Sequence, residues 1–260
     1  MSKTFNFFKR NIKELLRDPM IYIFCLGFPV VMMIIFQIIN NASGGHTSMF
    51  ELNALLPAII MFSYTFVMLT MALLVSKDRQ TFFLKRLYSS PMRPINFILG
   101  YFLVGFAVAI CQTVICIILG LLISLISKVE YISFGEVLLL IVSQLPILIT
   151  NVLFGILFGT VFNDKTAPGI CSVFISLSGM LGGCWMPLDT MGGLEVFCRF
   201  LPFYPSVCLG RVVTGATKTL GGVYVLDSTI LLGFIPIAVF MVGSIVLSIV
   251  AFKKNMVSDK

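Results

Sequence analysis

The chain has few residues that could carry out bond-making chemistry. Its single histidine, His46, stands in a Gly/Ser/Asn-rich segment, where a solvated loop residue is expected rather than a ligand or a base. The sequence contains no H-E-x-x-H zinc motif, no convincing Ser/His pair and no G-x-x-x-x-G-K-[ST] phosphate loop. We therefore expect neither an enzyme, even one that works inside a membrane, nor a cofactor or metal bound to this chain.

The seven cysteines do not change that expectation, because their spacing matches no metal site. Four lie within long apolar stretches and are predicted to be inert packing residues, namely Cys25, Cys111, Cys116 and Cys171. Cys184, Cys198 and Cys208 cluster near the predicted outer face, and the sequence leaves open whether two of them form a disulfide.

Long apolar stretches make up most of the chain, in which hydrophobic residues are 58% and charged residues 11%. Each stretch meets or approaches the ~20 residues that a helix needs to cross a bilayer core. Backbone polar groups cannot stay unpaired in lipid, so the stretches must be helices. We expect an all-α polytopic membrane protein, a single domain over residues 1–260 with six transmembrane helices. The stretches are residues 20–39, 53–75, 97–126, 134–162, 168–185 and 226–252.

The net charge of +7 could indicate a nucleic-acid-binding protein, but the distribution of charge argues against that. With the N-terminus placed inside, fourteen of the eighteen Lys and Arg residues fall on the inner face. Positive charge in short loops marks the cytoplasmic side, so both termini are predicted to be cytoplasmic. Topology and contact with anionic lipid head groups account for most of these charges, and no nucleic-acid partner is expected.

Residues 1–18 are predicted to form an amphipathic helix at the membrane surface, ended by Asp18-Pro19. Lys9, Lys13 and Arg17 recur at every fourth position on one side of it. The apolar side comprises Phe5, Phe8, Ile12, Leu15 and Leu16. This helix is either a membrane anchor or a docking surface for a cytoplasmic partner, and the two roles are compatible.

The inner segment 77–96, between the second and third stretches, is predicted to contain a second short amphipathic helix. Its apolar stripe comprises Phe83, Leu84, Leu87 and Tyr88, and its cationic positions are Arg79, Lys85 and Arg86. Ser89-Ser90-Pro91 ends the helix. A simpler interpretation is a surface helix that only connects two spans.

Small residues mark two of the spans as sites of close helix packing. The fourth stretch contains Gly155 and Gly159, a small-xxx-small pair. The fifth stretch carries a longer strip of small residues, at steps of three and four, along one helix face: Gly169, Ser172, Ser176, Gly179 and Gly183. This strip is either an intramolecular packing face or a seam between subunits.

Residues 185–227 are too long for a tight outer turn and too apolar for a free loop. Pro187, Pro202 and Pro205 divide them into segments that are too short to span a membrane. Glu195 and Arg199 stand at helical i, i+4 spacing in one of these segments. We expect two re-entrant helices at the outer mouth, because such backbone is tolerated only where protein or water covers it.

Taken in order over nearly the whole chain, these features resemble the permease subunit of type-two ATP-binding-cassette (ABC) exporters, in particular its small drug- and antibiotic-export branch. The resemblance is carried by the N-terminal helix, the segment Phe83–Met92, the stretch Ser178–Asp189, and Leu201-Pro-Phe-Tyr-Pro-Ser with Arg211 behind it. One difference is that Lys77–Thr81 stands where the family often has a Glu-rich start and a glycine.

The resemblance implies a complex of two permeases and two ATPase subunits, with ATP and Mg²⁺ bound by the ATPases. Residues Arg79–Tyr88 would be the coupling helix on the ATPase, and Asn163, Asp164 and Lys165 would give a smaller contact. The path would lie between permeases, lined mainly by spans one, two and five. The outer gate would comprise the broken helices, with Pro187, Glu195, Arg199, Pro202, Pro205 and Arg211.

The resulting prediction is the membrane permease of an ATP-driven exporter for an amphipathic or hydrophobic compound, such as a drug, an antibiotic or a peptide-like molecule. Its partner permease would be a second copy or a paralogue. Export of a lipid-linked glycan is an alternative within the same family. A self-sufficient secondary transporter or channel is an alternative from another class. It would need intramembrane carboxylates or inverted repeats with broken helices in both halves, and a broken-helix region stands only near the C-terminal end.

Overall fold

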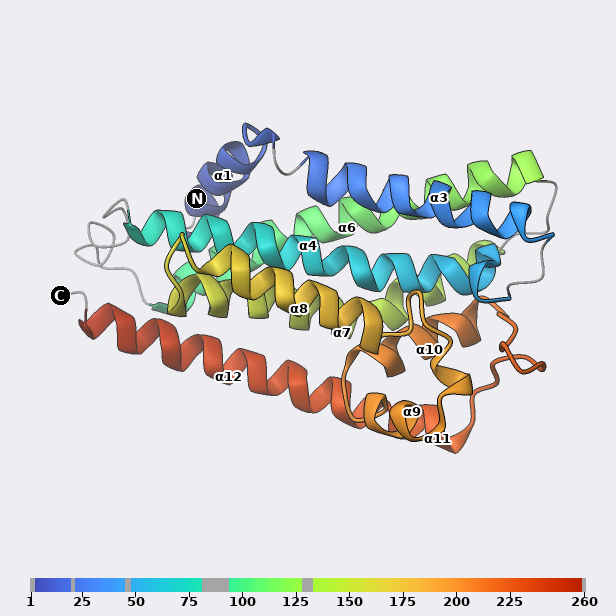
Figure 1. The fold of residues 1–260 in the computed structure, drawn as a ribbon. Helices are drawn as coiled ribbons and strands as arrows, with labels where there is room; N and C mark the ends of the chain where they lie inside the picture. The colour runs from blue at the N-terminus through green and yellow to red at the C-terminus, as the bar shows by residue number, and fades with distance from the viewer. Residues whose placement is uncertain (1–2, 20–21, 45–47, 81–93, 128–132, 259–260) are drawn as a thin grey trace.

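The computed structural model describes residues 3–19, 22–44, 48–80, 94–127 and 133–258. Long helices run side by side in a bundle (Figure 1), and α1 and the end of α12 lie at the same end of it. The first half contains α1 (Lys3–Leu15), η1 (Tyr22–Gly27), α3 (Phe28–Ala42), η2 (Ser48–Phe50), α4 (Leu52–Gln80) and α6 (Pro94–Ser127). The second half contains α7 (Phe134–Val161), α8 (Ala167–Leu181), η3 (Leu188–Thr190), α9 (Gly192–Cys198), α10 (Phe203–Val213), α11 (Ser228–Leu232) and α12 (Phe234–Ser258).

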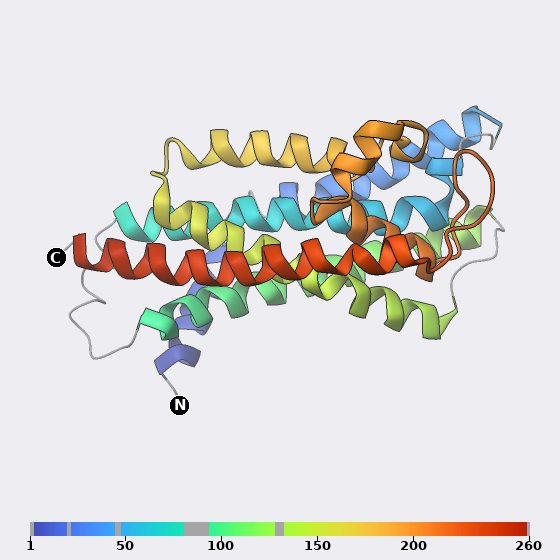
Figure 2. The same ribbon diagram turned by 90° about the horizontal axis from the view of Figure 1, so that it is seen from below.

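The expected all-helical membrane fold is confirmed. Within the described residues, five helices are long and apolar enough to cross a membrane. The helix pair α9 and α10, bent by 97°, stands before the last of them, where the prolines predicted broken helices. The pair lies at the end of the bundle opposite α1 (Figure 2).

The fifth predicted span is shorter than expected. The sequence predicted residues 168–185, but the helix α8 has 15 residues and ends at Leu181. A helix of that length spans about 22 Å, which is less than the ~30 Å core of a bilayer. The chain leaves the helix because Gly182 and Gly183 follow, and Gly183 has a φ of +68° that L side chains rarely adopt.

Helix α4 occupies the centre of the bundle. In its apolar 18-residue window 83% of residues are buried within the protein, compared with 17% for the span formed by η1 and α3. Helices α3, α6, α7, α8 and α10 all pack against it. Helix α4 therefore has almost no surface left for lipid. The arrangement of the helices around it determines which of its side chains remain accessible.

The closest packing is between α4 and α7, at the glycines that the sequence singled out. A Cβ on Gly155 would lie 2.5 Å from the carbonyl oxygen of Met68, and one on Gly159 would lie 2.5 Å from that of Ala72. Real Cβ atoms do not approach backbone so closely, so these positions require glycine. The small-xxx-small prediction for this span is confirmed.

The replacement Gly155→Ala should destabilise the protein by about 1–3 kcal/mol, because the added methyl group must push two packed backbones apart. The matched control is Gly243→Ala in α12, where a Cβ would meet nothing within 4 Å. That control should be neutral or slightly stabilising, since alanine favours a helix more than glycine does. Thermal unfolding of the purified variants measures the difference. Equal stability of the two variants would contradict the packing described here.

Candidate functional site

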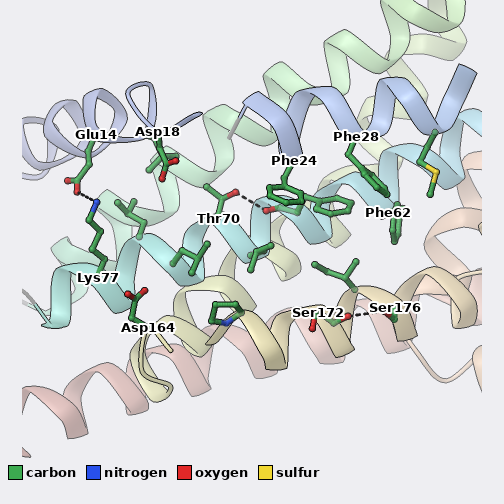
Figure 3. Close-up of a pocket in the computed structure, with 18 of the residues that line it drawn as sticks. Glu14, Asp18, Phe24, Phe28, Phe62, Thr70, Lys77, Asp164, Ser172 and Ser176 are labelled. Carbon is green, nitrogen blue, oxygen red and sulfur yellow. Dashed lines mark hydrogen bonds and ion pairs between the residues drawn. The ribbon is translucent and has the colours of Figure 1, made fainter. Parts of the chain in front are cut away.

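A groove of about 800 Å³ runs along α4, between η1 and α3 on one side and α8 on the other. Figure 3 shows its floor on α4 and its two walls. The walls come from parts of the chain more than a hundred residues apart. The predicted translocation path was to be lined by spans one, two and five, and these are the segments that line this groove.

Aromatic rings line the end of the groove that lies away from α1. Phe28 lies 4.7 Å from Phe66 between ring centroids, and Phe62 lies 4.5 Å from Trp185, edge to face. Phe24 stacks on Phe66 at 6.3 Å. Edge-to-face and offset contacts of this kind stabilise a packed cluster, so the rings form a continuous apolar wall.

The opposite end of the groove, near α1, is charged. Glu14, Asp18, Lys77 and Asp164 lie there, away from Phe28 and Phe62 (Figure 3). Lys77 Nζ is 3.6 Å from Glu14 Oε1, and Ser76 donates a hydrogen bond of 3.3 Å to Asp164. The groove is therefore amphipathic along its length.

The small-residue strip of the fifth span divides into two parts. Ser172 and Ser176 are exposed and line the groove, and a Cβ on Gly169 would meet nothing within 4 Å. Gly179, by contrast, is buried, and a Cβ there would collide with the ring of Trp185. The part nearer α1 is open to a partner or a ligand, whereas the part farther from α1 packs within the chain.

An ion cluster joins α1, α4 and α6 at the end of the groove near α1. Arg10 makes two hydrogen bonds of 2.8 Å to the carboxylate of Asp78, which also accepts one of 2.7 Å from Tyr101. Burial alone would lower the pKa of Arg10, but the hydrogen bonds and charge of Asp78 outweigh it and raise that pKa above its ordinary value. Arg10 also contacts Glu14 at 2.8 Å.

Sequence reasoning missed this cluster. It treated Arg10 as one of several surface cations and Asp78 only as a difference from the family pattern. It also did not single out the face of the N-terminal helix that packs on the bundle, where Phe7, Asn11 and Leu15 are buried and only Leu15 belongs to the predicted apolar side. These three residues stand at i, i+4 and i+8, the spacing of one helix face. The polar Asn11 between Phe7 and Leu15 interrupts the apolar pattern by which such a face is recognised in a sequence.

The predicted ATPase contacts are only partly described. Phe83, Leu84, Lys85, Arg86, Leu87 and Tyr88 lie outside the described residues. Arg79 donates a hydrogen bond to the carbonyl of Thr160, so it joins α4 to the end of α7. Asn163 and Lys165 are exposed in the turn between α7 and α8, whereas Asp164 is half-buried in the groove.

At the end of the bundle opposite α1, Arg211 holds three segments together. It is buried in α10 and donates hydrogen bonds to the carbonyls of Ala54 (3.2 Å) and Gly183 (2.9 Å). Its guanidinium also lies 5.7 Å from the ring centroid of Tyr224. Arg211 therefore fixes the start of α4 and the exit of α8 to the bent helix pair.

The first helix of the bent pair carries the expected ion pair. Arg199 Nη2 lies 2.7 Å from Glu195 Oε1, which also accepts a hydrogen bond from Tyr204. Phe197 and Phe200 on the same segment are exposed.

The prolines of this region stand at helix starts, with Pro187 preceding η3, Pro202 preceding α10 and Pro205 in its first turn. The disulfide left open by the sequence is not formed, since Cys184, Cys198 and Cys208 are buried free thiols.

The model of the family described as ABC-2 type transporter matches residues 3–214, which include the groove, the ion cluster and the bent helix pair. The chain belongs to this family. A comparison with curated proteins found no match. The ABC-2 permease is a multi-pass membrane transport subunit that works with ABC ATPase subunits. In the part of the chain described, no group of three or more His, Cys, Asp or Glu side chains is placed to hold a metal ion.

The permease should lose stability when the ion cluster is broken. Asp78→Ala leaves Arg10 and Tyr101 without their shared acceptor, and we expect a cost of about 2–4 kcal/mol. The control is Glu14→Ala, which removes more exposed ion pairs and should cost less than about 1 kcal/mol. Thermal unfolding in detergent compares the two variants. If Asp78→Ala is no more destabilising than Glu14→Ala, the cluster does not hold α1 to α4.

Proposed function

We propose that this ABC-2 permease is the membrane half of an ATP-driven exporter that moves an amphipathic or hydrophobic compound out across the cytoplasmic membrane. The groove over α4 is the observation that carries the proposal. Its volume of about 800 Å³ lies within the ~300–1,000 Å³ typical of small-molecule sites. Its aromatic wall favours an apolar body, and its charged end favours a polar group on the same molecule.

The proposed complex contains two ATPase subunits and a second permease, either a copy of this chain or a paralogue. The open side of the groove faces outward from the single chain, and the exposed Ser172 and Ser176 lie along it. Helix α3 has little protein around it, so a second permease would cover both walls. Cargo would then occupy a space between the two subunits.

In the proposed cycle the ATPases act through the segment Arg79–Tyr88, which follows directly from α4. Binding of ATP moves this segment, and α4 carries the movement to the floor of the groove. ATP can shift the permease between states only because the ATPases bind those states with different affinity. The bent pair α9–α10, held by Arg211, is the proposed outer gate, and both termini are cytoplasmic in this arrangement.

Two other functions remain as alternatives. An exporter of a lipid-linked glycan would use the same fold and the same ATPases. The aromatic wall suits it less well, because a glycan needs polar partners, and in this groove they are confined to Ser172, Ser176, Thr70 and the charged end near α1. A self-sufficient channel or carrier would require no ATPase, and this requirement separates it from both exporters.

The test is transport in proteoliposomes that contain the permease with or without its co-purified ATPase. We expect uptake of a fluorescent amphipathic dye into inside-out vesicles only when both proteins and ATP are present. Leu87→Asp should lower this uptake at least tenfold, because a buried charge at an apolar contact costs more than 1.4 kcal/mol.

The matched control is Leu220→Asp, at an outer residue that is 77% exposed, and it should transport normally. Transport by the permease without the ATPase would favour the carrier. Unchanged ATPase binding and uptake in Leu87→Asp would contradict the coupling role of the segment Arg79–Tyr88. Transport of a lipid-linked glycan with no transport of dyes would favour the glycan exporter.

A further inference from the structure

We propose that the groove selects amphipathic cations, with the positive group held near Asp164 and the apolar body against Phe28, Phe62 and Trp185. This inference deepens the proposed function, on which it rests for the identification of the bound molecule as cargo. Binding to the groove itself is a separate property of the permease, and it is measured without ATP or ATPase.

The charges at the end of the groove near α1 favour a cation. Among the described residues that line the groove there are three carboxylates, Glu14, Asp18 and Asp164, and one ammonium group, Lys77. Lys77 is already paired with Glu14. A charged molecule that enters this space therefore meets an excess of negative charge.

Of the three carboxylates, Asp164 is the best placed to bind a cation. Glu14 and Asp18 also line a neighbouring hollow of about 810 Å³, together with Lys9, Arg10, Lys13 and Arg17, so cations of α1 lie close to them. Asp164 lines the groove and not that hollow. It accepts a hydrogen bond from Ser76, and no Lys or Arg of the described residues forms an ion pair with it.

The surroundings of Asp164 strengthen its attraction for a cation. The carboxylate is half-buried at the start of a groove that is otherwise lined largely by Phe, Leu, Ile and Met side chains. Coulombic attraction increases as water is excluded, since the effective dielectric constant falls. An anion would meet repulsion at the same place, and a neutral molecule would gain nothing there.

The aromatic wall accommodates the apolar body of the same molecule. Phenylalanine and tryptophan side chains offer large apolar surfaces that pack against other rings in offset or edge-to-face contacts. Phe28, Phe62 and Trp185 lie in one cluster, with Phe62 between the other two at centroid distances of 6.1 Å and 4.5 Å. An apolar molecule with a positive charge therefore fits both ends of the groove, and its length would lie along α4.

The structure also supplies a reporter for binding, because Trp185 is the only tryptophan of the chain. Its indole excites diphenylhexatriene by energy transfer. Three forms of that probe share one rod-shaped aromatic body: the trimethylammonium derivative, the unsubstituted molecule and the propionate. Full-length permease in detergent is titrated with each probe, and the saturable part of the transfer gives an apparent Kd.

We expect the trimethylammonium probe to bind most tightly and the propionate most weakly. Asp164→Asn should weaken binding of the trimethylammonium probe about three- to tenfold, while binding of the unsubstituted probe stays the same. Asp164→Glu should restore most of the affinity for the cation. The control is Glu136→Gln at the outer start of α7, where glutamine also serves a capping box, and it should leave all three affinities unchanged.

Each outcome decides the inference. Unchanged affinity of the neutral probe in Asp164→Asn shows that the variant is folded, so a selective loss of the cation supports the proposal. Equal binding of cation and propionate overturns it, as does an equal loss of all three probes in Asp164→Asn. Absence of saturable transfer in any form also overturns it and favours a second permease as the occupant of the groove.

The exporter itself is tested by the vesicle assay and not by these titrations. ATP-driven uptake of the unsubstituted probe without any preference for the cation would leave the proposed function intact and remove only the charge selectivity. Selective binding of the cation with no ATP-driven uptake would support the charge selectivity of the groove and contradict the proposed function. An ATPase contact made by Asp164 would not alter the titrations, because the ATPase is absent from them.

Discussion

The burial of α4 is the constraint on which the rest of the structure depends. A helix in lipid satisfies its own backbone, but a helix surrounded by other helices must also fit a different neighbour on every face. Helix α4 meets α7 through Gly155 and Gly159, and it presents Phe62, Phe66 and Thr70 to the groove. Each neighbour takes a separate face, so a change in the position of α4 alters the groove and the helix interfaces together.

The two ends of α4 are held by polar contacts of different kinds. Asp78 lies at one end, bound to Arg10 and Tyr101, and the carbonyl of Ala54 accepts a hydrogen bond from Arg211 at the other. The first contact joins α4 to the N-terminal helix beside the predicted ATPase-binding segment. The second joins it to the bent helix pair. Helix α4 is therefore the direct physical connection between the N-terminal helix, the groove and the bent helix pair.

Sequence patterns predicted the features that the bilayer itself imposes. Long apolar stretches predicted the spans, prolines predicted the broken helices after α8, and Gly155 and Gly159 predicted close packing. These features are local, so a short window of sequence contains them. The extent of α8 was predicted less well, because apolar residues continue past Leu181 although the backbone turns at Gly182 and Gly183.

The features that the sequence did not reveal depend on how separate segments pack against one another. Arg10 and Asp78 are 68 positions apart, and nothing in either segment distinguishes Arg10 from its neighbouring cations. Gly179 was grouped with Ser172 and Ser176 by spacing, but the return of Trp185 onto α8 buries only the glycine. Arg211 was placed at the gate by resemblance, and its three partners come from different segments of the fold.

In the proposed mechanism α4 moves together with α6 and α7 as one rigid scaffold, so the separation of the groove walls on α3 and α8 changes with the nucleotide state of the ATPase. The most direct measurement is the distance between spin labels at Met32 of α3 and Ser176 of α8, in labelled permease diluted with unlabelled copies. A reference pair at Ile118 of α6 and Val142 of α7 reports on the scaffold. Trapping ATP on the partner should change the first distance and leave the second unchanged. A first distance that stays the same when ATP is trapped, or a reference distance that changes equally, would contradict this mechanism.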